Sequence, residues 1–259
     1  MPSSLKKLVV VTGASRGIGR AVSEILVAHE VTVIGVARSA DALQGLAQRL
    51  APSFIACAAD ITTPAGVDLV HSAVAAQGDA ELAGLVNNAG VLEPIAKLAD
   101  VDLSLLRAHL ETNVVSVVSL TQRLLPQLRA SRGRVVNVSS GAATGAYQGW
   151  GAYCMGKAAL NMLTQVLACE EDRVVAVSVR PGVVATDMQA LIRNEGGAAM
   201  KPEQHCKFTR LHSEGALLPP ERPAASIACL AVCAEKSHSG MFYSWDSPEI
   251  AALVDAWTL

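Results

Sequence analysis

The sequence predicts an α/β fold, a doubly wound parallel sheet of about seven strands with helices on both faces. Two observations predict it. Short apolar runs rich in β-branched residues alternate along the chain with longer segments in which Ala and Leu recur at helical spacing. The short runs are also apolar at successive positions, which is typical of strands that helices cover on both faces.

The apolar runs define the expected strands, and each crossover between them is expected to be right-handed. Strands are predicted at residues 8–11, 31–36, 54–58, 82–86, 134–138, 174–179 and 241–243. The segments between them carry the helical pattern and predict helices at residues 17–29, 39–50, 64–76, 100–129 and 151–169.

A large core and one domain are expected from the composition. The 259 residues are 51% hydrophobic and only 17% charged, so the chain has enough apolar side chains to fold. No linker divides it, and residues 1–259 are predicted to form a single domain. The segment 189–222 differs because it holds Gly196-Gly197 and Pro219-Pro220 after the sixth predicted strand. It is predicted to be a lid or substrate loop near the carboxyl edge of the sheet.

Charge and hydropathy argue against two classes of partner. The 21 basic and 23 acidic residues nearly balance and no long run of Lys or Arg occurs, so no nucleic-acid partner is predicted. No stretch reaches the roughly 18 uninterrupted apolar residues of a membrane span, so no membrane partner is predicted. Met1 to Lys7 leads straight into an apolar run and a glycine turn, which predicts a first strand and no signal peptide.

The cysteines and histidines indicate a reducing compartment and no metal. The six cysteines are scattered, and the close pair Cys229 and Cys233 lies in an apolar helical stretch without a nearby histidine. Free thiols and the missing signal predict a cytoplasmic protein. The six histidines form no ligand spacing, so no metal site is predicted.

A glycine-rich turn follows the first predicted strand. It reads Thr12-Gly13-Ala14-Ser15-Arg16-Gly17-Ile18-Gly19 and opens the first predicted helix. These glycines allow a tight turn, close approach of the backbone to a pyrophosphate and close packing of helix on strand. The helix N-terminus presents free N–H groups to the anion. The turn therefore predicts a Rossmann-type dinucleotide site, and an ordinary strand-to-helix turn is the alternative.

The end of the second predicted strand bears on which dinucleotide binds. An NAD-binding protein places an acidic residue there, whereas this chain reads Ala37-Arg38-Ser39. A guanidinium at this position pairs with a 2′-phosphate, and Arg16 is placed to close on that group from the glycine turn. NADP is therefore the predicted cofactor, and a solvated Arg38 without a ligand is the alternative.

Polar residues also follow the next two strands. Asp60-Ile61 comes after the third strand, and Asn87-Asn88-Ala89-Gly90 ends the fourth. We expect Asp60 to accept the adenine amino group and the turn from Asn88 to Gly90 to offer backbone contacts beside the cofactor. Taken alone, each of these would be a polar turn.

The strongest chemical signal is the pair Tyr153 and Lys157, with Ser139-Ser140 upstream. Residues four apart on a helix share a face, so we expect the ammonium to lower the pKa of the phenol from about 10. Such a tyrosine exchanges a proton near neutral pH. A surface pair without a catalytic role is the alternative.

Together these motifs resemble the short-chain dehydrogenase/reductase family over essentially the whole chain. The resemblance implies hydride transfer between a nicotinamide and a carbonyl or alcohol group. It implies that Ser140 hydrogen-bonds the carbonyl oxygen, Tyr153 protonates it, Lys157 holds the ribose and tunes the tyrosine, and Asn113 fixes a water of the proton relay. It further implies that a turn closes over the nicotinamide, formed by Pro181, Gly182, Val184 and Thr186.

Within the family, the stretches 149–157 and 186–189 resemble the sepiapterin reductase and benzil reductase branch. The resemblance implies reduction of a carbonyl, often one of two adjacent ones, with NADPH. Trp150 is expected either to line the substrate pocket or to pack beneath the loop. Sepiapterin reductases carry an Asp that grips the pterin amine, four residues after the Gly of a Ser-Gly pair. This chain has Ser244 at that position and Asp246 two residues further on.

The expected function is that of an NADPH-dependent carbonyl reductase acting on a small dicarbonyl or aromatic ketone. Two alternatives stay open, an alcohol dehydrogenase acting on a sugar, steroid or polyol, and an NADP-binding sensor that does no chemistry. The resemblance also implies a homodimer or homotetramer, because the helices bearing Asn113 and Tyr153 commonly form a dimer face in this family.

Overall fold

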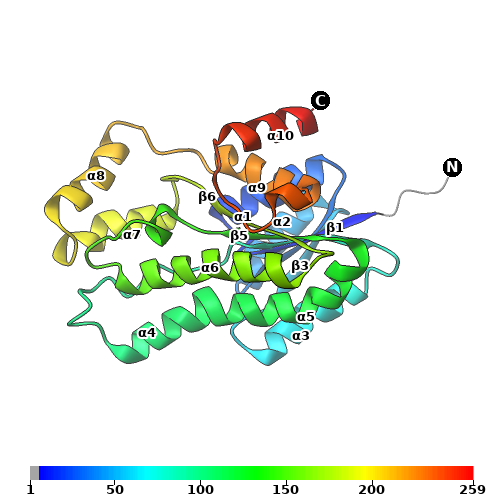
Figure 1. Ribbon diagram of the computed structural model, residues 1–259, viewed down its shortest axis with the longest axis horizontal. Coiled ribbons are helices and arrows are strands. Elements are labelled where there is room, and N and C mark those ends of the chain that lie inside the picture. The colour runs from blue at the N-terminus through cyan, green and yellow to red at the C-terminus, as the bar shows by residue number, and fades with distance from the viewer. Residues whose placement is uncertain (1–5, 259) are drawn as a thin grey trace.

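A computed structural model describes residues 6–258 of the chain. Its seven strands form one parallel sheet, as the sequence predicts (Figure 1). The strand order is β3-β2-β1-β4-β5-β6-β7. Each observed strand lies within one or two residues of its predicted position. The strands are β1 (Lys7–Thr12), β2 (Thr32–Ala37), β3 (Phe54–Ala58), β4 (Glu81–Asn87), β5 (Arg134–Val138), β6 (Val175–Arg180) and β7 (Phe242–Ser244).

Helices cover both faces of the sheet. On one face lie α1 (Gly17–Ala28), α2 (Ala40–Leu50) and α9 (Glu221–Cys233), with α10 (Pro248–Thr258) packed on α9. On the other face lie α3 (Pro64–Ala75), α5 (Ser116–Ser131) and α6 (Gly151–Glu170). Three further helices are α4 (Leu103–Leu110), α7 (Asp187–Glu195) and α8 (Pro202–Ser213).

The strands alternate their side chains between two apolar layers, which is why the runs are hydrophobic at every position. In β1, Val9 and Val11 pack on the α1 and α9 face, while Leu8 and Val10 pack on the opposite face. All four side chains are fully buried. A strand covered on both sides by helices must be apolar at both sets of alternating positions.

Two helical predictions need correction. The predicted helix 100–129 is two helices, α4 and α5, joined by a π-helical turn at Glu111–Val115. The segment 189–222, predicted as a lid or substrate loop, is largely helical and contains most of α7 and all of α8. Its sequence carries ordinary helix signals that were overlooked, Pro202 in the first turn of α8, Glu203 beside it and Arg210 in the last turn.

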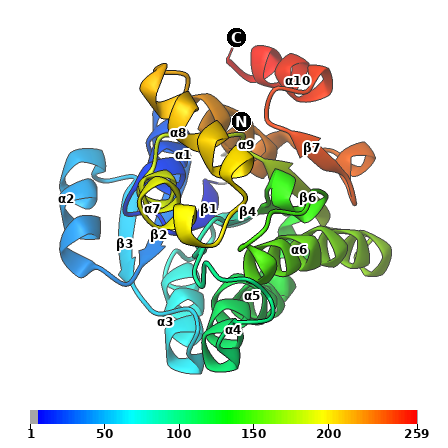
Figure 2. The same ribbon diagram turned by 90° about the vertical axis from the view of Figure 1, so that its left-hand side faces the viewer.

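The chain reverses its direction of strand addition between β1 and β4, because β2 and β3 lie on one side of β1 while β4 to β7 lie on the other. A crevice opens outside the carboxyl ends of the strands at such a switch point. Figure 2 looks onto this edge of the sheet, with α7 and α8 in front of the strand ends. The two helices of the 189–222 region therefore stand over the crevice.

A line of buried polar side chains joins the sheet to α6 below the crevice. Asn87 Nδ2 donates to Asn137 Oδ1 at 2.9 Å, and Asn137 Nδ2 donates to Thr164 Oγ1 at 2.8 Å. The Thr164 and Ser178 hydroxyls lie 2.6 Å apart and share a hydrogen bond. Buried polar groups of this kind stabilise one packing arrangement, because shifting α6 would leave them unpaired.

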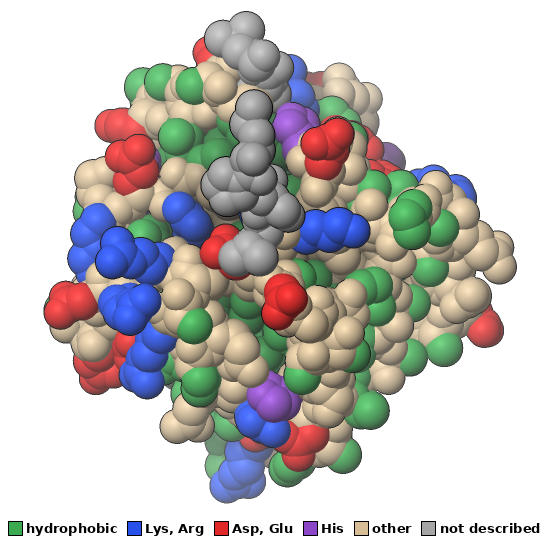
Figure 3. Space-filling view, turned by 90° about the vertical axis from the view of Figure 1, so that its right-hand side faces the viewer, with side chains coloured by type: hydrophobic (Ala, Val, Ile, Leu, Met, Phe, Trp, Pro, Cys, Tyr) green, Lys and Arg blue, Asp and Glu red, His purple; other side chains and the backbone are tan. Residues whose placement is uncertain are grey.

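The opposite end of the molecule bears charges of both signs. Figure 3 shows Lys and Arg scattered there together with Asp and Glu, with hydrophobic side chains between them. None of the helices within residues 6–258 is both long and apolar enough to cross a membrane. Of the segment Met1 to Lys7, which precedes the predicted first strand, residues 1–5 lie outside the described residues, and Lys7 begins β1.

Candidate active site

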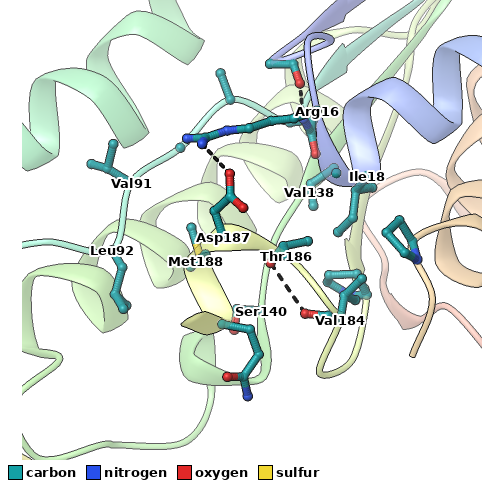
Figure 4. A pocket seen from close by; sticks show the side chains of 18 of the residues that line it. Arg16, Ile18, Val91, Leu92, Val138, Ser140, Val184, Thr186, Asp187 and Met188 are labelled. Atoms are coloured by element: carbon teal, nitrogen blue, oxygen red, sulfur yellow. Dashed lines mark hydrogen bonds and ion pairs between the residues drawn. The ribbon is translucent and has the colours of Figure 1, made fainter. Parts of the chain in front are cut away.

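One cavity of about 1090 Å³ opens at the carboxyl edge of the sheet, and Figure 4 shows part of its wall. It brings together predicted site residues from every part of the chain. Gly19 and Asn113 are the two that do not line it. The predicted residues that do are Thr12, Gly13, Ser15, Arg16, Gly17, Ile18, Arg38, Asp60, Ile61, Asn88, Ala89, Gly90, Ser140, Trp150, Tyr153, Lys157, Pro181, Gly182, Val184 and Thr186.

The glycine turn has the geometry that a dinucleotide requires. Gly13 and Gly17 have φ angles of +66° and +53°, which side chains disfavour. A Cβ at Gly19 would lie 2.3 Å from the Gly13 carbonyl oxygen, so Gly19 serves close packing of the turn and not the cavity wall. No side chain caps the N-terminus of α1, which leaves its first N–H groups available to an anion. The turn therefore fits a pyrophosphate.

Thr12 and Asn88 lock the turn to the end of β4. Thr12 Oγ1 accepts hydrogen bonds from the backbone N–H groups of Asn88 and Ala89, each at 3.0 Å. In return, Asn88 Nδ2 donates to the Thr12 carbonyl at 2.9 Å. These bonds hold the two sides of the switch point together, so the floor of the cavity is formed before any ligand arrives.

Arg38 and Asp60 lie at the adenosine end predicted for the cofactor. Both line the cavity, and no ion pair of Arg38 is present within residues 6–258. Asp60 Oδ1 accepts from the Thr62 N–H and hydroxyl at 3.0 and 2.7 Å. These bonds, helped by the charge of Arg38, lower the pKa of the Asp60 carboxyl. Arg38 is thus a cation still available to a phosphate.

Arg16 takes a different partner from the one expected. Its guanidinium forms an ion pair with Asp187 at the start of α7, and Figure 4 shows this pair spanning the cavity. Both side chains are largely exposed, so the pair contributes little to stability. The prediction that Arg16 closes on a 2′-phosphate stays a prediction, and in this structure its guanidinium pairs with a carboxylate 171 positions away.

Tyr153 and Lys157 lie one turn apart on α6 and are both buried, at 7% and 5% exposure. The Lys157 Nζ donates to the Val138 carbonyl at 2.7 Å, at the end of β5. It lies 5.6 Å from the centre of the Tyr153 ring. The spacing prediction that the two side chains share one face is confirmed.

The predicted direction of the tyrosine shift is wrong in this structure. Burial raises the pKa of the Tyr153 phenol to about 12, and the Ser140 hydrogen bond acts in the opposite direction without overcoming it. Burial also lowers the pKa of the Lys157 ammonium to about 8. The dry surroundings penalise both charged forms, and this desolvation exceeds the attraction that spacing alone suggests. At neutral pH Tyr153 therefore retains its proton.

Ser140 stands at the end of β5, where the chain turns away from the sheet. Its Oγ accepts from the Ala142 N–H at 3.1 Å and begins a 3₁₀ turn at Gly141–Ala143. Its hydroxyl also hydrogen-bonds Tyr153, and both side chains line the cavity. Ser139 is instead buried and donates to the Lys157 carbonyl at 3.4 Å, so the choice of Ser140 over Ser139 fits this geometry.

Asn113 lies behind the cavity wall, at the centre of the π turn. Its Oδ1 accepts from the Val91 N–H at 2.9 Å and its Nδ2 donates to the Val91 carbonyl at 2.8 Å. A Cβ at Gly90 would lie 2.9 Å from Asn113 Oδ1 and 3.7 Å from Lys157 Nζ. The missing side chain at Gly90 therefore leaves a space bounded by Asn113 and Lys157.

Aromatic rings form the wall next to Tyr153. Trp150 stacks on Tyr147 with ring centres 4.7 Å apart, and Phe208 of α8 lies 5.2 Å from Trp150. All three line the cavity. The indole Nε1 of Trp150 and the amide Nε2 of Gln189 are buried donors with no partner among the described residues. Trp150 thus both packs and lines the pocket.

The loop that carries these rings is tied to α8. The Gln148 N–H donates to Gln204 Oε1 at 3.0 Å, and Gln204 Nε2 donates to the Ala146 carbonyl at 3.2 Å. Gln148 Nε2 also donates to the Ala199 carbonyl at 3.0 Å. The sequence does not predict the bond between Gln148 and Gln204, because no local spacing links residues 56 positions apart.

His109 is the other residue that sequence reasoning missed. It was grouped with the dispersed histidines, yet it is buried and contacts Asn113, four residues further on. That four-residue spacing on a helix was the one signal available. Within the described residues, no group of three or more His, Cys, Asp or Glu is placed to hold a metal.

The comparison with protein families agrees with this geometry. The profile described as short chain dehydrogenase matches residues 7–196, which span the glycine turn, Ser140, Tyr153 and Lys157. The chain belongs to the short-chain dehydrogenase family. It is therefore an oxidoreductase of a family that binds a nicotinamide cofactor and acts on carbonyl or hydroxyl groups.

Relatives of this short-chain dehydrogenase include two named reductases. It is 38% identical to a benzil reductase ((S)-benzoin forming) from Saccharomyces cerevisiae, over 86% of this chain and 89% of that one. It is also 38% identical to sepiapterin reductase from Mus musculus, over 81% and 85% of the two chains. A solved short chain dehydrogenase/reductase from Saccharomyces cerevisiae has a TM-score of 0.91 at 37% identity, over 95% and 99% of the chains.

The buried ammonium of Lys157 gives a pH-dependent prediction. Its pKa is about 8 when folded and 10.5 ordinarily, so only the folded protein loses this proton as pH rises between those values. The unfolded state then binds more protons, and the free energy of unfolding rises with pH. Lys157→Met abolishes this dependence. Between pH 7 and 10.5 we therefore expect the free energy of unfolding of wild type to rise by about 3 kcal/mol relative to that of Lys157→Met.

Urea unfolding at a series of pH values measures this difference, and Tyr153 is present in both proteins, so its ionisation cancels. Lys97→Met, at an exposed position, is the control and should follow wild type at every pH. Parallel curves for Lys157→Met and wild type would show that the ammonium is not held in a dry site.

Proposed function

We propose that this short-chain dehydrogenase is an NADPH-dependent carbonyl reductase acting on small dicarbonyls or aromatic ketones. The observation that carries the proposal is the grouping of a protonated, buried Tyr153 with Ser140 and Lys157 on one cavity that also has an aromatic wall. A phenol that keeps its proton at neutral pH is suited to give it to a developing alkoxide.

Each catalytic side chain has a distinct task in the proposed reaction. A bound nicotinamide cofactor would supply the hydride to the carbonyl carbon. Ser140 and Tyr153 donate hydrogen bonds to the carbonyl oxygen, and these bonds strengthen as negative charge develops there. Tyr153 then gives its proton to that oxygen. Lys157, with its pKa near 8, is able to return a proton toward the phenol.

The cofactor preference rests on Arg38. Its guanidinium stands at the end of β2, where an NAD enzyme places a carboxylate, and it has no ion pair within residues 6–258. A 2′-phosphate would supply the missing partner through paired, charge-assisted hydrogen bonds. These features support NADP over NAD.

The substrate class rests on the wall beside Tyr153. Trp150, Tyr147 and Phe208 offer flat apolar surface to an aryl group, and the unpartnered Nε1 of Trp150 and Nε2 of Gln189 are donors for a second oxygen. The similarity to a benzil reductase supports an aromatic diketone. Ser244 binds the Asp246 carboxylate at 2.5 Å. A pterin amine would therefore meet an arrangement other than the single Asp of sepiapterin reductases.

The structure favours reduction over the alternative of alcohol oxidation. Oxidation needs Tyr153 as a base, and a phenol with a pKa of about 12 is protonated at neutral pH.

The sensor alternative gives no role to a buried lysine, which is costly to keep in a dry site. All six cysteines are free thiols, and this supports the cytoplasm as the compartment of the protein.

A second copy of this chain is the proposed partner. Exposed apolar side chains recur on three helices that lie side by side in Figures 1 and 2, α4, α5 and α6. On α6 they form a stripe, because Met155, Met162 and Val166 are spaced by seven and four residues. The others are Leu103 and Leu105 on α4, Val115 at the end of the π turn and Val118 on α5. Such a patch supports an interface between copies.

Tyr153→Phe tests the reaction. We expect the variant to bind NADPH as wild type does and to lose at least about a thousandfold in kcat, since it lacks the proton donor. NADPH consumption with benzil, a small aliphatic diketone and an aromatic monoketone measures reduction and substrate class. NADPH formation from NADP⁺ and a sugar alcohol measures the reverse reaction. Tyr243→Phe, at a tyrosine packed on the core, is the control. Unchanged turnover in Tyr153→Phe would refute the assignment.

Arg38→Asp tests the cofactor. We expect the ratio of kcat/KM for NADPH over NADH to fall by about a hundredfold, because the carboxylate repels a 2′-phosphate and accepts a ribose hydroxyl. Arg49→Asp on α2 is the matched charge change, since Arg49 pairs with Glu24 outside the cavity. A ratio that stays constant in Arg38→Asp would mean that Arg38 does not read the phosphate.

Met162→Glu tests the proposed partner. A charge on this 57% exposed methionine would be buried in the interface, so we expect the variant to be a monomer where wild type is a dimer or tetramer. Light scattering after size exclusion gives the mass of each. Leu69→Glu on α3 is an equally exposed control outside the patch. Equal masses for Met162→Glu and wild type would remove this surface as the interface.

A further inference from the structure

The buried residue of α4 is a histidine. In this helix, which is described in full, His109 is 1% exposed while Leu103 and Leu105 are 58% and 54% exposed. Leucine side chains gain more from burial than imidazole does, so packing alone does not explain this arrangement. The polar contacts of His109 must therefore explain why it is inside.

Both ring nitrogens of His109 are engaged, and their partners fix the tautomer. The Nδ1 lies 2.6 Å from the Glu93 carbonyl oxygen, which can only accept, so Nδ1 carries the proton. The Nε2 lies 2.7 Å from Asn113 Nδ2, which can only donate, so Nε2 is the acceptor. Burial, with the charge of Lys157, lowers the pKa of His109 and keeps the ring neutral.

The acceptor on His109 and the Val91 backbone favour the same orientation of the Asn113 amide. With Nδ2 held by His109 and the Val91 carbonyl, Oδ1 faces the Val91 N–H and the space beside Gly90. Rotating the amide would set Nδ2 against the Val91 N–H, donor against donor, and leave Nε2 of His109 unpaired. His109 thus holds Asn113 in one of two orientations.

The helix that carries Tyr153 and Lys157 makes room for this ring. A Cβ at Gly156 would lie 3.2 Å from His109 Nε2, tighter than an unstrained contact. The His109 ring also meets the Tyr153 ring edge to face, with centres 6.3 Å apart and planes at 78°. His109 is therefore packed against the Tyr153 ring and against α6 at Gly156, the residue before Lys157.

We propose that His109 is a positioning residue that acts through Asn113 on the supply of protons to Tyr153. The inference rests on the proposed function, because it assigns His109 a part in that reaction. By fixing Asn113 Oδ1 at the space between Gly90 and Lys157, His109 keeps an acceptor where a water can link Lys157 to solvent. Loss of the His109 side chain then slows the return of a proton to Tyr153 and leaves cofactor binding intact.

Two variants separate the two nitrogens of the ring. In His109→Gln the side-chain amide reaches the place of Nε2, so it can still accept from Asn113. In His109→Asn the shorter amide reaches the place of Nδ1, so it keeps the contact with Glu93 and leaves Asn113 without its acceptor. We expect His109→Gln to keep kcat within about threefold of wild type and His109→Asn to lose about tenfold. The Kd for NADPH should be unchanged in both.

Steady-state kinetics of diketone reduction, NADPH titration by fluorescence and the Tm of each variant measure these effects. A purely structural role would lower Tm in both variants with equal kcat. Equal kcat in the two variants, at any level, would overturn the proposal, as would a loss confined to NADPH affinity.

A readout without substrate keeps this test apart from that of the proposed function. Imidazole ¹H–¹⁵N spectra of wild type should show His109 with Nδ1 protonated and Nε2 bare, and the Nε2 shift should move in Asn113→Ala. A protonated Nε2, or an Nε2 shift that ignores Asn113→Ala, would overturn the proposal. If wild type reduces no carbonyl, the proposed function fails, while these spectra still decide whether His109 holds Asn113.

Discussion

The site depends on one buried contact, the hydrogen bond from the Lys157 ammonium to the Val138 carbonyl at the end of β5. A lysine side chain normally extends toward solvent, whereas Lys157 is 5% exposed and lies on a helix that is hydrogen-bonded to the sheet. Asn137, Thr164 and Ser178 bind helix and sheet together two turns further along. Tyr153 lies one turn from Lys157 on the same helix. The position of α6 therefore also places Tyr153 beside Ser140 at the cavity.

Burial then gives the site its chemistry. The same dry surroundings raise the pKa of Tyr153 and lower that of Lys157, because both charged forms are penalised, and at neutral pH the phenol keeps its proton. Electrostatic stabilisation of a developing alkoxide is strongest where water is excluded. The hydrogen bond between Gln148 and Gln204 and the ring contact of Trp150 with Phe208 contribute to that exclusion, because they hold α8 over the loop before Tyr153.

Local spacing predicted much of the fold and of the site. The two-sided apolar runs give the strands, and the glycine turn and the Tyr153/Lys157 pair are contiguous signals that need no tertiary information. The misses share a cause. The sign of the Tyr153 pKa shift depends on burial, and the Arg16–Asp187 pair joins distant segments. Spacing along the chain does not determine how much water surrounds a side chain.

A crystal structure of the protein with oxidised NADP and an aromatic diketone tests the central claim most directly. The account predicts one carbonyl oxygen within hydrogen-bond distance of both Tyr153 Oη and Ser140 Oγ, the aryl group against Trp150, and Lys157 still bound to Val138. A complex in which the diketone lies away from Tyr153, or in which Lys157 has left Val138 for solvent, would contradict it.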